Sequence, residues 1–107
     1  MDTFAALAEP NRRQIIEYLK AGPATVNALV EALAISQPMA SKHLHTLRAA
    51  GFVDMRPDGQ RRWYELQSQA FQELDEWLKS FQSYWNEELN ALERHLDEHP
   101  DRTIHEG

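Results

Sequence analysis

Residues 36–51, SQPMASKHLHTLRAAG, decide the fold of this chain. Ser36 is a good N-cap, because its hydroxyl can accept a hydrogen bond from a backbone amide of the first turn. Gly51 suits the left-handed conformation that ends many helices. Between them, apolar residues at i, i+4 and i+7 form one stripe, Ala40, Leu44 and Leu47. The stretch therefore predicts a helix with one face in a core and the other face toward solvent.

The polar side of this predicted helix carries side chains of the kinds that contact base edges and phosphates in DNA. They are Gln37, Ser41, Lys42, His45 and Thr46. An ordinary amphipathic surface helix would show the same pattern, so the flanking segments must decide between the two interpretations. His43 lies at the edge of the apolar stripe, where a structural imidazole and a DNA contact are equally reasonable.

The segment upstream predicts a second helix. Thr25 is a suitable cap, and the apolar face that follows consists of Val26, Leu29, Val30 and Leu33. Because only Ala34 and Ile35 separate the two helical patterns, the pair must form a tight helix-turn-helix. Such a unit can place its second helix in the major groove of DNA.

The segment downstream predicts a β-hairpin. Residues 52–56 and 61–66 have the composition of strands, and the Pro57–Gln60 turn between them contains Asp-Gly, a strong hairpin signal. Arg61 and Arg62 fall near the tip, where guanidinium groups can bind phosphates or enter the minor groove. The fold class is therefore mainly α with a small β-hairpin, a winged helix-turn-helix.

The distribution of charge agrees with DNA binding although the net charge is −6. Residues 36–64 carry five basic and two acidic side chains, whereas residues 65–107 carry three basic and eleven acidic ones. The positive potential is thus concentrated on the predicted helix and hairpin. Few phosphates are neutralised by each subunit, so nonspecific affinity should be modest and sensitive to salt.

Composition and the absence of certain motifs narrow the classes of protein to which this chain can belong. The chain has no cysteine, which excludes disulfides and thiolate sites. It has no apolar run long enough to span a membrane and nothing like a signal peptide, so we expect a cytoplasmic protein. No catalytic motif is present, and we expect no enzyme and no cofactor. Residues 1–99 are expected to form one domain, followed by a mobile polar tail at 100–107.

The C-terminal third carries apolar residues with spacings of 3 and 4, a near-heptad pattern. They are Phe71, Leu74, Leu78, Phe81, Trp85, Leu89, Leu92 and Leu96. The pattern predicts one helix of about seven turns, capped by Ser68. A small domain cannot cover so long a stripe, and we expect a homodimer built on this helix and on Phe4 and Leu7 near the N-terminus. Packing of the whole stripe within one domain is the alternative.

Three segments resemble the ArsR/SmtB family of bacterial winged-helix repressors. Residues 7–16, LAEPNRRQII, resemble the first family motif, and residues 36–44 and 47–53 resemble the recognition helix and its exit. The resemblance covers residues 2–96 and implies a homodimeric regulator, usually a repressor, that binds a palindromic operator. In this family the first and last helices form the dimer interface. It implies DNA contacts at Gln37, Met39, Ser41, Lys42 and His45, with Arg61 and Arg62 on the wing.

The first family motif also has a structural interpretation. Pro10 opens a helix, and Arg12 and Arg13 either pair with acidic neighbours or touch phosphates; we favour the structural role.

The chain departs from the metal sensors of that family. Its residues 26–30 hold no cysteine, and residues 76–88 hold no histidine. His95 and His99 are spaced i, i+4, but two histidines without a third ligand are weak evidence for zinc. We therefore expect no metal site.

Two functions remain open. One is a DNA-binding repressor; the other is a protein-interaction module that uses the long acidic, aromatic-rich C-terminal helix. A repressor released by a protein or small-molecule effector would combine both, although large aromatics at helical spacing more often serve packing.

Overall fold

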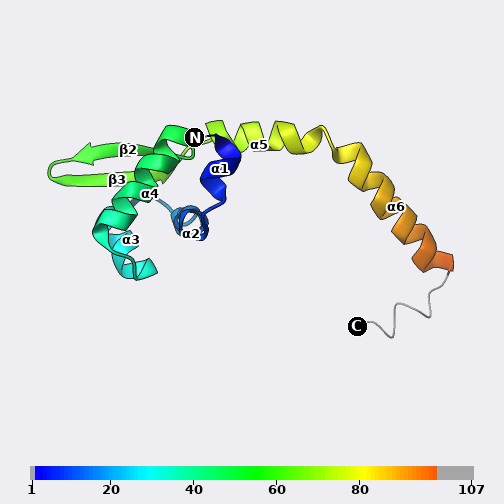
Figure 1. The fold of residues 1–107 in the computed structure, drawn as a ribbon, viewed down its shortest axis with the longest axis horizontal. Coiled ribbons are helices and arrows are strands. Elements are labelled where there is room, and N and C mark those ends of the chain that lie inside the picture. Colours follow the sequence, from blue (N-terminus) through cyan, green and yellow to red (C-terminus); the bar gives the residue numbers. More distant parts are fainter. Residues whose placement is uncertain (1, 99–107) are drawn as a thin grey trace. The chain divides into compact units, whose positions relative to one another are not determined.

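The computed structural model describes residues 2–98. The chain divides into two compact units, residues 1–74 and residues 75–107. The elements, labelled in Figure 1, are α1 (Thr3–Leu7), α2 (Pro10–Leu19), β1 (Ala24–Thr25), α3 (Val26–Leu33), α4 (Gln37–Ala50), β2 (Val53–Asp58), β3 (Arg61–Leu66), α5 (Gln69–Lys79) and α6 (Gln82–Glu98).

The predicted helix-turn-helix is confirmed, and its caps form as expected. The Thr25 hydroxyl accepts a hydrogen bond from the Ala28 amide at 3.2 Å, and the Ser36 hydroxyl accepts one from the Met39 amide at 3.2 Å. Ala34 turns the chain between the helices in the left-handed conformation, with φ of 54°. The sequence predicted the turn but not the strained alanine within it.

Helix α4 ends in a Schellman motif centred on Gly51, whose φ is 90°. The Gly51 amide donates to the Arg48 carbonyl at 3.1 Å, and the Phe52 amide donates to the Leu47 carbonyl at 2.9 Å. Both Leu47 and Phe52 are fully buried, at the two positions whose side chains often make the apolar contact of this motif. The motif fixes the direction in which the chain leaves α4 for the hairpin.

The hairpin is longer, and its turn tighter, than the sequence indicated. The predicted four-residue turn at 57–60 is wrong: β2 continues through Asp58, which pairs with Arg61, so only Gly59 and Gln60 connect the strands. Pro57 is tolerated in β2 because this strand lies at the edge of the sheet, whose order is β1-β3-β2. The sequence did not predict β1, which pairs antiparallel with β3.

The core of residues 1–74 lies between the helices and the sheet. Helices α1 to α4, the sheet and the start of α5 all contribute buried side chains, the largest being Phe52, Ile15, Leu29, Leu44, Leu47 and Val53. Phe52 also meets Phe71 edge-to-face, with ring centroids 5.1 Å apart. This contact joins the exit of α4 to α5 within the same unit.

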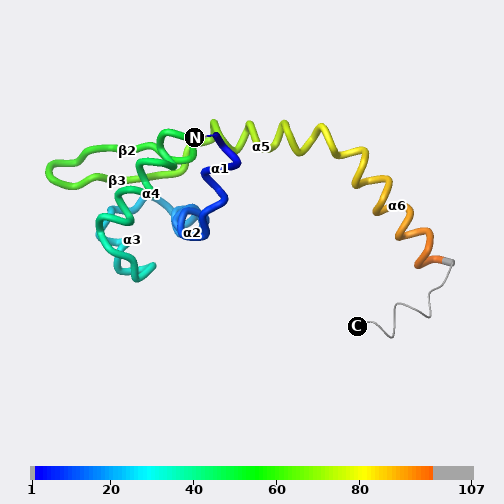
Figure 2. The backbone as a smooth tube through the Cα atoms, viewed as in Figure 1, coloured from blue at the N-terminus to red at the C-terminus, as the bar shows by residue number. Residues whose placement is uncertain are grey.

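The prediction of one seven-turn helix after Phe71 is wrong, because the helix is interrupted at Ser80 and Phe81 (Figure 2). The Ser80 hydroxyl donates to the Trp77 carbonyl at 2.6 Å, and the Phe81 amide bonds the Leu78 carbonyl three residues back at 3.0 Å. Such local bonds compete with the α-helical ladder and tighten its last turn. Apolar spacing continues across the interruption, which explains why the pattern did not reveal it.

Ser68 precedes α5, and its backbone carbonyl accepts the first helical bond from the Gln72 amide at 2.9 Å. The Ser68 hydroxyl accepts a bond from the Gln72 side chain at 3.4 Å. The predicted start of the helix is therefore right to within one residue.

Candidate nucleic-acid interface

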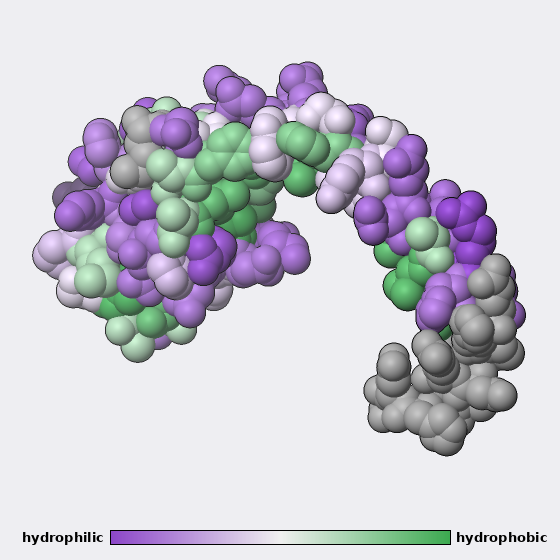
Figure 3. Space-filling model, turned by 45° about the vertical axis from the view of Figure 1, so that its right-hand side comes forward, coloured by the Kyte–Doolittle hydropathy of each residue, from purple (hydrophilic) through white to green (hydrophobic). Residues whose placement is uncertain are grey.

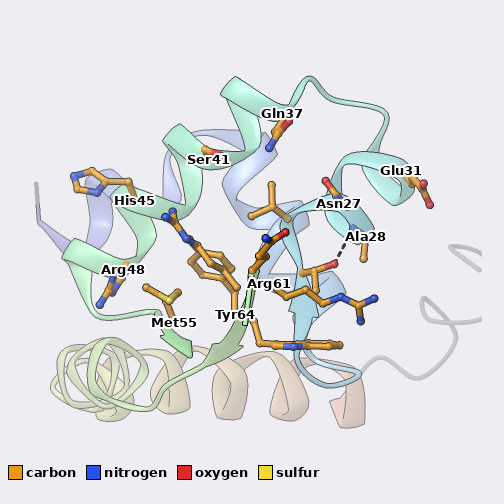
Figure 4. Close-up of a pocket in the computed structure, with 15 residues that line it drawn as sticks. Asn27, Ala28, Glu31, Gln37, Ser41, His45, Arg48, Met55, Arg61 and Tyr64 are labelled. Carbon is orange, nitrogen blue, oxygen red and sulfur yellow. Dashed lines mark hydrogen bonds between the residues drawn. The ribbon is translucent and has the colours of Figure 1, made fainter. Parts of the chain in front are cut away.

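One side of α4 carries a row of exposed polar side chains that faces the hairpin. Gln37, Ser41, His45 and Arg48 are spaced by 4, 4 and 3 residues, which places them on one stripe of the helix. Figure 4 shows these four side chains along α4, with Arg61 of β3 opposite them. The sequence predicted the first three; Arg48 belongs to the same stripe, one turn beyond the contacts that the family resemblance implies.

An open groove of about 960 Å³ lies between α3, α4 and the hairpin. Five of the seven predicted DNA contacts line it, namely Gln37, Ser41, His45, Arg61 and Arg62. Arg48, Asn27 of α3 and Gln60 of the hairpin turn also line it and were not predicted. Sequence spacing could have indicated Arg48, but only tertiary structure brings Asn27 and Gln60 to the same groove.

The charge of the groove is mainly positive. Arg48, Arg61 and Arg62 contribute guanidinium groups, and Glu31 is the acidic residue among those that line it. All three arginines are exposed. This arrangement suits a polyanion, since exposed guanidinium groups can bind phosphates or the acceptor edge of guanine.

The other two predicted contacts lie away from the groove. Met39 is 43% exposed, and its sulfur accepts a hydrogen bond from the Asn11 side chain at 3.7 Å, next to the start of α2. Lys42 is exposed but does not line the groove. The predicted contacts on α4 thus do not share one stripe, because Met39 lies beside α2 and Lys42 lies outside the groove.

His43 is structural. It is only 9% exposed, and its Nδ1 lies 3.4 Å from Nη1 of Arg12. Since arginine can only donate, Nδ1 accepts and the ring is neutral. Burial lowers the pKa of His43 below 6.5, as do the nearby charges of Arg12 and Lys42, while Glu9 acts in the opposite direction.

Arg12 and Arg13 hold the end of α1, which agrees with the structural role that the sequence favoured. Nε of Arg12 donates to the Ala6 carbonyl at 2.6 Å, and Nη1 of Arg13 donates to the Leu7 carbonyl at 2.6 Å. Their partners are backbone carbonyls rather than the acidic side chains expected from the sequence. Cations stabilise a helix at this end because its last carbonyls carry partial negative charge.

The predicted dimer residues fall into two groups. Leu7, Phe71 and Leu74 are partly buried against the core of residues 1–74. Phe4, Leu78, Phe81, Trp85, Leu89 and Leu92 are exposed. Figure 3 shows apolar surface among polar side chains along the C-terminal helical segment.

Within residues 2–98, no three acidic or histidine side chains come together to hold a metal ion. The possible pair of His95 and His99 cannot be described, since His99 lies outside those residues, as does the predicted tail at 100–107. None of the helices in the described part of the chain has the length and apolar character needed to cross a membrane.

Comparison with known proteins gives the same result as the geometry. Residues 9–55 match the family described as "Bacterial regulatory protein, arsR family". The chain is 37% identical over 100 residues to the HTH-type transcriptional regulator Rv2034 of Mycobacterium tuberculosis, covering 94% of this chain and 91% of the relative. It is 32% identical over 80 residues to the transcriptional repressor SdpR of Bacillus subtilis, covering 75% and 89% of the two chains.

Solved structures of transcriptional regulators also match this chain. The crystal structure of an ArsR family transcriptional regulator matches with a TM-score of 0.71 and 32% identity, covering 78% of this chain and 87% of the other. A possible transcriptional regulator for arsenical resistance matches with a TM-score of 0.70 and 37% identity, covering 76% and 84%. The chain therefore belongs to the ArsR family of winged helix-turn-helix, DNA-binding transcriptional regulators, and is not an enzyme.

Proposed function

We propose that this regulator is a repressor that binds a palindromic operator as a homodimer, with α4 in the major groove and the β2–β3 hairpin beside it. The observation that carries the proposal is the exposed polar row on α4, which faces the arginines of the hairpin across one groove. Relatives such as SdpR are named repressors. No catalytic step is involved; function consists of occupying DNA.

Base recognition is assigned to short polar side chains and phosphate binding to the cations. Gln37 and Ser41 lie on the first turns of α4, the part of a recognition helix that reaches base edges. Lys42, Arg61 and Arg62 supply positive charge around them. Acidic side chains are concentrated after residue 64, and the segment that carries them is assigned to dimerisation instead of DNA contact.

Selection of bound sequences from a random duplex pool tests this assignment. A twofold-symmetric consensus is expected, with half-sites about 10–10.5 base pairs apart or a multiple of that. An asymmetric consensus would contradict homodimeric binding. Recovery of no preferred sequence, together with a stoichiometric protein partner and no duplex affinity at low salt, would favour the interaction-module alternative.

Substitution of matched glutamines tests the recognition helix. Gln37→Ala should weaken binding to the selected duplex by ~1–3 kcal/mol and relax preference at one position in each half-site. Gln14→Ala removes another exposed glutamine, from α2, and should leave both the affinity and the sequence preference unchanged. If the two variants have the same affinity and the same sequence preference, Gln37 does not contact a base.

The homodimer is assigned to the exposed apolar side chains of α1, α5 and α6. A second copy would cover large apolar groups such as Trp85, Leu89 and Leu92, which are otherwise left in water. Leu89→Glu should shift the protein toward monomer in sedimentation experiments, whereas Asn90→Glu, the same charge change on another side of α6, should not. A wild-type chain that sediments as a monomer at all concentrations would refute the dimer.

A further inference from the structure

Arg12 of α2 connects three helices through a single guanidinium group. Its Nε donates to the Ala6 carbonyl at 2.6 Å, and its Nη2 donates to the Ala5 carbonyl at 3.2 Å. Its Nη1 lies 3.4 Å from Nδ1 of His43 on α4. A planar group with several fixed donors can hold all three acceptors at once, which a lysine cannot do.

The far end of α1 is attached to α5. The Thr3 hydroxyl donates a hydrogen bond to the Glu73 carboxylate across 70 residues of sequence. Thr3 is buried, and Figure 1 shows α1 next to the beginning of α5. A continuous chain of contacts therefore runs from α5 through α1 and Arg12 to His43, all within residues 1–74.

His43 is the point at which this chain reaches the DNA-facing helix. It is buried on the inner side of α4, whereas the next residue toward the N-terminus, Lys42, is exposed on the outer side. A contact that fixes His43 from behind consequently fixes the orientation of the outer side chains. Arg12 reaches α4 through His43 on this inner side, and it is not among the residues that line the groove beside the hairpin.

We propose that Arg12 is a positioning residue for operator recognition, coupling α1 and α5, which we assigned to the dimer interface, to the orientation of α4. This inference rests on the proposed function, since it concerns regulation of the same DNA-binding surface. Coupling of this kind is carried by a continuous network of hydrogen bonds between elements, and the contacts of Arg12 and Thr3 form such a network.

A phosphate contact by Arg12 is the competing explanation, and salt dependence separates the two. A residue that binds a phosphate contributes about 0.9 to the slope of log affinity against log salt. A positioning residue changes affinity but leaves that slope unchanged. The measurement uses the full chain and the duplex obtained from the random pool.

Arg12→Gln is expected to weaken binding about tenfold, within the usual range for coupling between sites, with an unchanged salt slope. Arg13→Gln is the matched control, because Arg13 is exposed and its bond goes to the Leu7 carbonyl of α1. The control should bind within about twofold of the wild type. Circular dichroism and thermal unfolding establish that each variant is folded.

Substitutions of His43 test the same contact and remain informative if Arg12→Gln does not fold. His43→Leu removes the acceptor and should reproduce the loss, whereas His43→Gln keeps an acceptor and should retain most of the affinity. The double variant Arg12→Gln/His43→Leu should bind no more weakly than Arg12→Gln alone, since both substitutions remove the same Arg12–His43 contact. Thr3→Val, which keeps the side-chain shape, should weaken binding in the same direction.

Several outcomes would overturn the inference. They are wild-type affinity in Arg12→Gln or His43→Leu, additive losses in the double variant, or a salt slope that falls by about 0.9 in Arg12→Gln, as removal of a phosphate-binding group would produce. Unchanged affinity in Thr3→Val would remove α5 from the coupling. Failure of the wild-type chain to bind any duplex would instead refute the proposed function, so the two failures are distinguishable.

Discussion

Gly51, which ends α4, allows a quantitative test of the fold. Its φ of 90° is unfavourable for any residue with a Cβ atom. A Cβ added there would lie 3.5 Å from Cδ of Gln69 and 3.7 Å from Cβ of Ala70, which are ordinary van der Waals contacts. The space is therefore adequate, and the cost of Gly51→Ala comes from the backbone alone.

The size of that cost follows from two opposing effects. Holding an L-residue in the left-handed region costs ~1–2 kcal/mol, while alanine lowers the entropy of the unfolded chain, which offsets ~0.4–1 kcal/mol. The free energy of unfolding should fall by about 1 kcal/mol. For a chain of this size, that loss corresponds to a decrease in Tm of about 4–8 °C.

A graded series makes the prediction specific. Gly51→Asn should destabilise less than Gly51→Ala, because asparagine tolerates the left-handed conformation. Gly51→Val should destabilise more, because a β-branched residue at positive φ is a strong outlier. Stability should be measured by urea unfolding, followed by circular dichroism, at one protein concentration, because self-association would add to apparent stability.

Two results would refute this account of Gly51. Wild-type stability in Gly51→Ala would mean that the helix does not end in a left-handed residue. An asparagine variant less stable than the alanine variant would mean that side-chain contacts, not backbone conformation, decide the cost. Either result would also remove the stated reason for the path from α4 into the hairpin.

Three further outcomes are expected. Because the folded-state pKa of His43 is lowered from 6.5, the unfolded chain binds more protons below that pH. The free energy of unfolding should therefore decrease as the pH falls below 6.5 in the wild type, and less steeply in His43→Gln, as measured by urea denaturation at a series of pH values. Phe52→Ala should lower the free energy of unfolding by ~3–5 kcal/mol, measured in urea, since that side chain is fully buried; a decrease below about 1 kcal/mol would contradict its place in the core. Replacing Arg61 and Arg62 by alanine should reduce the salt slope of DNA binding by about 0.9 for each phosphate that the hairpin no longer neutralises, and an unchanged slope would remove the hairpin from the phosphate-binding set.

Local sequence determined the elements that position the proposed DNA-binding surface. Ser36 and Gly51 mark the two ends of α4 through side-chain and backbone chemistry that needs no distant partner. The hairpin follows in the same way from turn residues between two extended segments. For this reason α4 and the exposed residues on it were predictable from one sequence.

Tertiary structure decided the features that depend on residues far apart in the chain. His43 meets Arg12, which lies 31 positions away in the sequence, and the groove requires Asn27 and Gln60 to meet α4 across the fold. β1 exists only because β3 lies beside it. At Ser80, local hydrogen bonds end a helix whose apolar spacing continues. Periodicity records which side of a helix is apolar, but it carries no information about where the backbone hydrogen bonds stop or which distant group a buried side chain meets.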